Sequence, residues 1–169
     1  FREPKGLAVS GNFLYVADEG NHVVRRVGLE TGGAVTTVAG TAGDPGDVDG
    51  DKSTARLRSP TSVAIGTKGD ADALFVAEKM KGRVRWVDIS TSTLDVVTLV
   101  GGGDSYVPGS HLDGDSNAAI LRAPSALAAR GELVYVADEG SVRIIDVGAG
   151  ITGSAAGATL RTVAGTATS

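Results

Sequence analysis

A stretch of fourteen residues occurs twice in this chain, and a weaker version lies between the two copies. Leu7–Gly20 (LAVSGNFLYVADEG) recurs as Leu127–Gly140 (LAARGELVYVADEG) with nine identical positions, and Leu74–Met80 (LFVAEKM) is the middle version. An Arg-containing apolar run follows each copy, and a TVAG or TLVG motif closes it. Because equivalent sequences must solve the same packing problem, we expect three equivalent structural units of about 60 residues.

Each unit alternates short apolar runs with turn residues, as β-strands do. The runs of the first unit predict strands at Lys5–Val9, Phe13–Ala17, Val23–Val27 and Val35–Ala39. Gly11 and Gly131 supply the positive φ of a tight hairpin. The middle unit carries four more residues at this turn, Gly66–Ala73, which we expect to enlarge the loop. With 25 glycines and no long apolar run of helical period, the chain is predicted to be all-β.

The segments between the units repeat as well. Asp49–Pro60 (DGDKSTARLRSP) matches Asp113–Pro124 (DGDSNAAILRAP), and Phe1–Pro4 (FREP) matches the end of both. We therefore predict one domain over residues 1–169 and infer that it is a section of a longer array. The units are expected at about residues 4–41, 60–102 and 124–166, with linkers at 42–59 and 103–123.

The first unit (PKGLAVSGNFLYVADEGNHVVRRV) resembles the NHL repeat, and the third unit does so too. In the second unit the motif's acid is Glu78, and Lys81-Gly82 stands where the first unit has Asn-His. The resemblance implies four-stranded blades of a β-propeller, of which this chain holds about three of six. One four-stranded sheet cannot bury both of its faces, and three blades cannot close a ring. Two sheet faces are thus expected to await further blades of the same or another chain.

Every unit also carries one acid and two arginines at equivalent positions. The acid at the end of the second strand accepts turn amides or pairs with an arginine, a role that serves the fold of each unit. We predict that a linker or third-strand arginine lies within salt-bridge distance of each acid. The acids are Asp18, Glu78 and Asp138, the third-strand arginines are Arg25, Arg85 and Arg143, and the linker arginines are Arg2, Arg58 and Arg122.

The linkers contain alternating carboxylates that could converge on a calcium ion. These residues are Asp47, Asp49, Asp51, Asp113 and Asp115. Counted as an EF-hand loop from Asp47, however, Lys52 stands where glycine is needed and Arg58 where glutamate is needed. A glycine-assisted turn is the preferred interpretation, and a calcium site is the alternative.

No catalytic or cofactor-binding set is recognisable. Gly148–Gly153 (GAGITG) has dinucleotide-fingerprint spacing, but no helix pattern follows it. The chain has no Cys, and His22 and His111 lie in different units, so no zinc site is predicted. We expect no cofactor and favour a non-enzymatic module. The resemblance also permits half of a propeller hydrolase or lyase, such as the related lyases that cleave peptidyl hydroxyglycine, with missing blades completing the site.

A second alternative is RNA binding, because some NHL propellers bind single-stranded RNA through a basic face. Two basic groups are available: Arg25 and Arg26, and then Lys79, Lys81, Arg83 and Arg85. Trp86 and Phe75 are expected to pack between blades rather than to stack on bases. The net charge of −4 also argues against a nucleic-acid partner.

The favoured prediction is therefore a structural or protein-interaction scaffold whose partner surface lies on the variable turns. Its partner is expected to be a protein or further propeller blades. The chain has no apolar stretch long enough to span a membrane. Loops rich in Thr, Ser and Gly, few lysines and the lack of Cys favour an extracellular setting.

Overall fold

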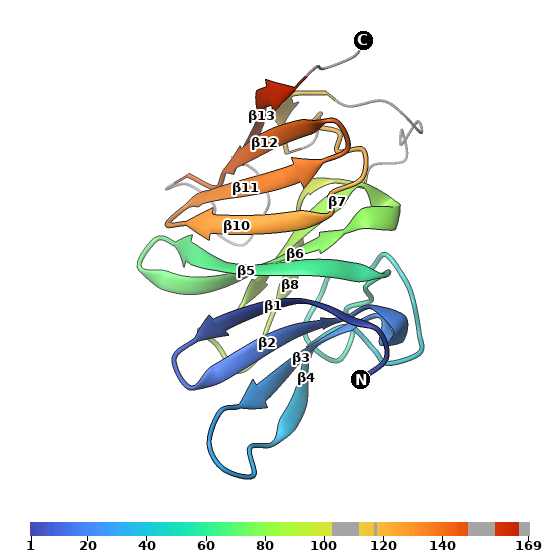
Figure 1. Ribbon diagram of the computed structural model, residues 1–169, viewed down its shortest axis with the longest axis vertical. Coiled ribbons are helices and arrows are strands. Elements are labelled where there is room, and N and C mark those ends of the chain that lie inside the picture. The colour runs from blue at the N-terminus through green and yellow to red at the C-terminus, as the bar shows by residue number, and fades with distance from the viewer. Residues whose placement is uncertain (103–111, 117, 149–157, 166–169) are drawn as a thin grey trace.

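In the computed structural model the chain forms three antiparallel sheets, and this confirms the predicted all-β propeller fold (Figure 1). The structure describes residues 1–102, 112–116, 118–148 and 158–165. His111 and most of Gly148–Gly153 lie outside this part. Sheet one consists of β1 (Pro4–Ser10), β2 (Phe13–Asp18), β3 (Val23–Gly28) and β4 (Val35–Ala39). Sheet two consists of β5 (Pro60–Lys68), β6 (Ala71–Glu78), β7 (Arg83–Asp88) and β8 (Val96–Gly101).

Sheet three has a fifth strand that comes from the linker. Its repeat strands are β10 (Ala126–Arg130), β11 (Leu133–Asp138), β12 (Ser141–Asp146) and β13 (Thr159–Gly165). The additional strand is β9 (Gly114–Asp115), which pairs with the outer edge of β13. Short 3-10 helices, η1 (Glu19–Asn21) and η2 (Lys79–Lys81), join the second and third strands of sheets one and two. The outer edge of a sheet is thus where a linker attaches.

The insertion in the middle unit lengthens two strands instead of enlarging their turn, contrary to our expectation. Strands β5 and β6 stay paired as far as Lys68 and Ala71, and only Gly69 and Asp70 form the turn. The longer hairpin reaches sheet three, where the Thr67 amide donates to the Gly131 carbonyl at 2.9 Å. This hydrogen bond and the pairing of β5 with β6 satisfy backbone groups of the additional residues in the extended conformation.

The glycine of each TVAG or TLVG motif allows the outer strand to pass close to the start of the third strand. Gly101 has a φ of +82°, and a Cβ placed there would lie 2.1 Å from the Gly82 carbonyl oxygen. Gly40 repeats this arrangement beside the His22 carbonyl, with a φ of +85°. Any side chain would collide with backbone here, which explains why each unit ends in glycine.

The sheets stack face to face, with β1, β5 and β10 side by side as the innermost strands (Figure 1). One core lies between sheets one and two, and another lies between sheets two and three. Leu57 and Leu121, one from each linker, are fully buried in these cores. Phe75 is fully buried and Trp86 is 8% exposed in the second core, as their predicted place between blades requires. Each linker therefore connects two sheets and also adds a leucine to the core between them.

Candidate functional site

Each sheet buries one carboxylate at the end of its second strand. Asp138 accepts the backbone N–H of Arg122 at 2.9 Å, and the Arg143 guanidinium lies 3.3 Å from it. The matching contacts are Arg2 N–H to Asp18 (2.6 Å), Arg25 to Asp18 (3.2 Å), Arg58 N–H to Glu78 (2.5 Å) and Arg85 to Glu78 (3.3 Å). All three acids are at most 4% exposed. Each acid joins a linker backbone to the third strand, and that strand supplies the ion-pairing guanidinium.

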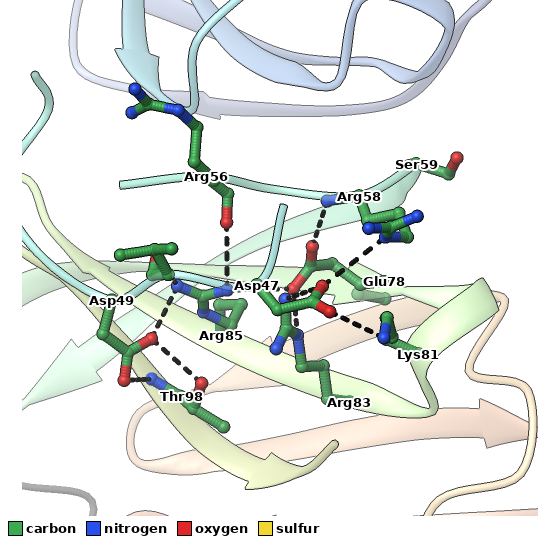
Figure 2. Close-up of polar contacts among 12 residues, drawn as sticks. Asp47, Asp49, Arg56, Arg58, Ser59, Glu78, Lys81, Arg83, Arg85 and Thr98 are labelled. Carbon is green, nitrogen blue, oxygen red and sulfur yellow. Dashed lines mark hydrogen bonds and ion pairs between the residues drawn. The ribbon is translucent and has the colours of Figure 1, made fainter. Parts of the chain in front are cut away.

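Sheet two enlarges this arrangement into a network of charges (Figure 2). Glu78 also accepts a hydrogen bond from Arg83 at 2.5 Å. Arg83 is the residue paired with the acid across β6 and β7, and the residues at this position in the other sheets are Val23 and Ser141. The longer glutamate side chain allows one carboxylate to contact two guanidinium groups. Arg83 in turn lies 3.1 Å from Asp47, which also binds Lys81 at 2.6 Å. The first linker is therefore fixed to sheet two by several ion pairs.

A second acidic position holds each linker against the outer strand of the sheet that follows it. Asp49 accepts the amide and the hydroxyl of Thr98, both at 2.9 Å, and lies 2.6 Å from Arg85. In sheet three Asp113 makes the same three contacts, with Thr162 and Arg143. We call this arrangement of a linker aspartate, a third-strand arginine and an outer-strand threonine the linker latch. Asp49 and Thr98 are visible together in Figure 2.

The structure gives each of the candidate calcium ligands a protein partner. Asp49 and Asp113 belong to the latches, and Asp47 faces three cationic side chains. Asp51 accepts hydrogen bonds from the Ser53 and Thr54 amides, and Asp115 accepts one from the Ala118 amide. Within the described residues no group of three or more His, Asp or Glu side chains is arranged to hold a metal ion. These contacts support the turn interpretation of the linker.

Several of these carboxyls have a lowered pKa. Partial burial raises the pKa of Asp113, but hydrogen bonds from Thr162 and Arg143 outweigh it and lower the pKa overall. The pKa of Asp18 is lowered in the same way, because contacts from Arg2, Asn21 and Arg25 outweigh the effect of burial. Protons therefore bind these groups more tightly in the unfolded chain, where an aspartate titrates near about 3.9.

Acid is accordingly expected to destabilise the fold through these carboxyls. The free energy of unfolding should have their full contribution above about pH 4 and lose it as the pH falls through the lower folded pKa values. Urea titrations between neutral and acidic pH measure this. Asp113→Asn should flatten the profile, whereas Asp70→Asn, at an exposed turn, should leave it unchanged. A profile that Asp113→Asn does not alter would contradict the assignment.

The basic residues behind the RNA-binding hypothesis are mostly engaged within the protein. Arg83 and Arg85 are buried in ion pairs with Glu78, and Lys81 binds Asp47. Arg26 lies over the Phe13 ring at 4.6 Å. His22 accepts the Ser59 amide through Nδ1 at 3.1 Å, so this histidine also contacts the linker. The positive charges are thus used to hold strands and linkers together.

Sheet one exposes an apolar face whose equivalents in the other sheets are packed. Leu7 and Val35 are 60% and 52% exposed, and Val9 on the same face is 59% exposed. At the equivalent registers of sheet two, Val63 is 3% exposed and Val96 is fully buried. We call Leu7, Val9 and Val35 the open face of sheet one. The repeat alone predicted that such a face would remain.

Comparison with known proteins finds matches to two repeat families and to NHL repeat-containing proteins. Residues 1–26 match the NHL repeat, and residues 123–151 match the LVIVD repeat. NHL repeat-containing protein 2 from Homo sapiens is 32% identical over 161 residues, and the Bos taurus protein of that name is 30% identical. Each alignment covers 87% of this chain but 21% of the relative. The chain thus spans about a fifth of the length of these curated relatives.

Solved structures share the fold. A putative phosphatase from Bacteroides thetaiotaomicron superposes with a TM-score of 0.68 at 22% sequence identity, over 82% of this chain and 32% of that protein. At this level of identity the likeness concerns architecture alone. Among the described residues no helix is long and apolar enough to cross a membrane.

Proposed function

Because the chain belongs to the NHL-repeat family, we propose that it is a non-enzymatic interaction and structural module that docks onto another β-sheet through the open face of sheet one. The observation that carries this proposal is the exposure of Leu7, Val9 and Val35 at positions where sheet two is packed. Contiguous exposed apolar side chains of this kind mark interaction surfaces. Burying the exposed part of each of these side chains would contribute on the order of 1 kcal/mol to the free energy of docking.

The charged groups support the same proposal. The three acids that recur in every unit are buried, and each accepts a linker backbone amide and pairs with the third-strand arginine of its sheet, as a structural role requires. The tight turn of the longest hairpin, at Gly69, is also engaged, because the Gly69 amide donates to the Glu132 side chain at 2.9 Å. The open face therefore offers a better docking surface than this turn.

The proposal is tested by sedimentation velocity over a concentration series. In a solution of the chain alone, the only sheets available to the open face belong to other copies, so self-association is expected. The variant Leu7→Lys/Val9→Lys should weaken it by at least about tenfold, since lysine cannot be buried in an apolar interface without cost. Leu29→Lys, which changes a 53% exposed leucine outside the open face, is the matched control. A chain that stays monomeric, or associates equally well with both lysines, would refute the proposal.

A further inference from the structure

The segment between the second and third strands of sheet two differs in charge from its equivalents in the other two sheets. The residue after the buried acid is Glu19 in sheet one and Glu139 in sheet three, but it is Lys79 in sheet two. Both glutamates have a partner, because Glu19 pairs with Lys5 at 3.6 Å and Glu139 pairs with Arg122 at 3.2 Å. Lys79 is exposed and forms no ion pair with any residue that the structure describes. Its charge is therefore available to another molecule.

Cations outnumber carboxylates at this end of sheet two. Four cations accompany two carboxylates: the cations are Arg58, Lys79, Lys81 and Arg83, and the carboxylates are Asp47 and Glu78. The neighbouring pair of Arg85 and Asp49 adds no net charge. The Arg58 and Lys81 side chains lie beside Asp47 and remain 40% and 37% exposed (Figure 2). In a chain with a net charge of −4, this is a locally positive surface.

Apolar side chains are exposed beside these cations. Met80, which lies between the two lysines of η2, is 66% exposed, and the other two sheets have Gly20 and Gly140 at this position. Val48 in the linker is 50% exposed. An ion pair of 2.6 Å between Lys81 and the residue before Val48 holds the linker beside η2. The surface thus combines unpaired positive charge with apolar side chains.

The fold of the unit does not require lysine and methionine in η2. Sheets one and three form the same four strands and bury the same acid with glutamate and glycine at the two positions. The backbone of η2 is nevertheless fixed, because the Gly82 amide donates to the Lys79 carbonyl at 3.3 Å and Gly101 packs against the Gly82 carbonyl. A fixed backbone presents its side chains to a partner at a low ordering cost.

We propose that the η2 end of sheet two binds an acidic segment of a partner protein, in which carboxylates flank an apolar side chain. This surface consists of Arg58, Lys79, Lys81, Met80 and Val48. The carboxylates would pair with the cations, and the apolar side chain would contact Met80, whose flexible thioether adapts to apolar surfaces of varied shape. A methionine between the lysines favours protein over single-stranded RNA, whose bases stack on aromatic rings. The surface belongs to sheet two and its linker, so this inference goes beyond the docking of sheet one and does not rest on it.

The probe is a rhodamine-labelled peptide of the sequence Glu-Asp-Leu-Asp-Glu, titrated by fluorescence anisotropy. We expect saturable binding that weakens as salt is added. The variant Lys79→Glu/Met80→Gly gives sheet two the residues that the other sheets carry, so its thermal unfolding should match that of the unmodified chain while peptide binding weakens by at least about tenfold. Arg130→Glu makes the same change of charge per residue at the exposed end of β10, and this control should weaken binding by less than about threefold.

A second peptide, with glycine in place of leucine, measures the apolar contact and should bind less tightly than the first. No saturable binding up to about 1 mM peptide would overturn the inference. Equal affinities of the Lys79→Glu/Met80→Gly variant and the unmodified chain would overturn it too, as would an equal loss in Arg130→Glu, which would mean that only net charge acts. An oligouridylate that binds more tightly than the peptide, and loses affinity in the Lys79→Glu/Met80→Gly variant, would show a nucleic-acid site instead.

Discussion

Glu78→Ala should lower the free energy of unfolding by about 3–5 kcal/mol, since removing one partner of a buried ion pair leaves the other charge uncompensated. Glu78 is fully buried and contacts two guanidinium groups, those of Arg83 and Arg85. The Arg58 amide would lose its acceptor in the same step. Chemical denaturation monitored by circular dichroism measures the change.

An exposed ion pair provides the control for this result. Asp44 lies 2.7 Å from Arg56, and its side chain is 60% exposed. Asp44→Ala should therefore change the free energy of unfolding by less than about 1 kcal/mol. If Glu78→Ala costs no more than Asp44→Ala, the buried network does not hold the first linker in the way we describe.

Leu57→Ala should destabilise the protein by about 2–5 kcal/mol, because it opens a cavity between sheets one and two. The linker places this fully buried leucine beside Gly40, whose own Cβ position would lie 3.3 Å from it. Leu121 is buried in the same way between sheets two and three. Leu121→Ala should therefore have a cost in the same range.

Leu29→Ala is the matched control, since the side chain is of the same type and is 53% exposed. Leu29→Ala should change the free energy of unfolding by no more than about 0.5 kcal/mol. Equal effects of Leu57→Ala and Leu29→Ala would mean that the linker only connects the sheets and does not fill the space between them.

The strands could be predicted because their signals are local. The runs at Phe13–Ala17 and Val23–Val27 lie within one or two residues of the observed strands, and glycine marks the tight turn at Gly11. Equivalent apolar positions in three units also indicated that sheets would cover one another. Periodicity and turn chemistry act over a few residues, so they can be detected in one sequence.

The linker latches could not be predicted in this way, because their partners are distant in sequence. Asp49 and Thr98 are 49 residues apart, and the alternating acids around Asp49 suggested a turn or a calcium loop instead. A signal did exist: Asp113 and Thr162 have the same separation of 49. The pairing of Glu78 with Arg83 was similarly hidden, although both residues depart from the pattern of the other units.

The stacking of the three sheets is the claim on which the open face and the latch depend, and a NOESY spectrum tests it most directly. Gly6 lies against Ser62, where a Cβ on the glycine would be 2.6 Å from the Ser62 Cα. Gly66 lies against Ala129, where a Cβ on the glycine would be 3.1 Å from the Ala129 Cβ. We predict cross-peaks between the α-protons of Gly6 and Ser62, and between those of Gly66 and the Ala129 methyl group. If both are missing and the spectrum instead joins β4 to β5 in one continuous sheet, the stacked-blade account is wrong.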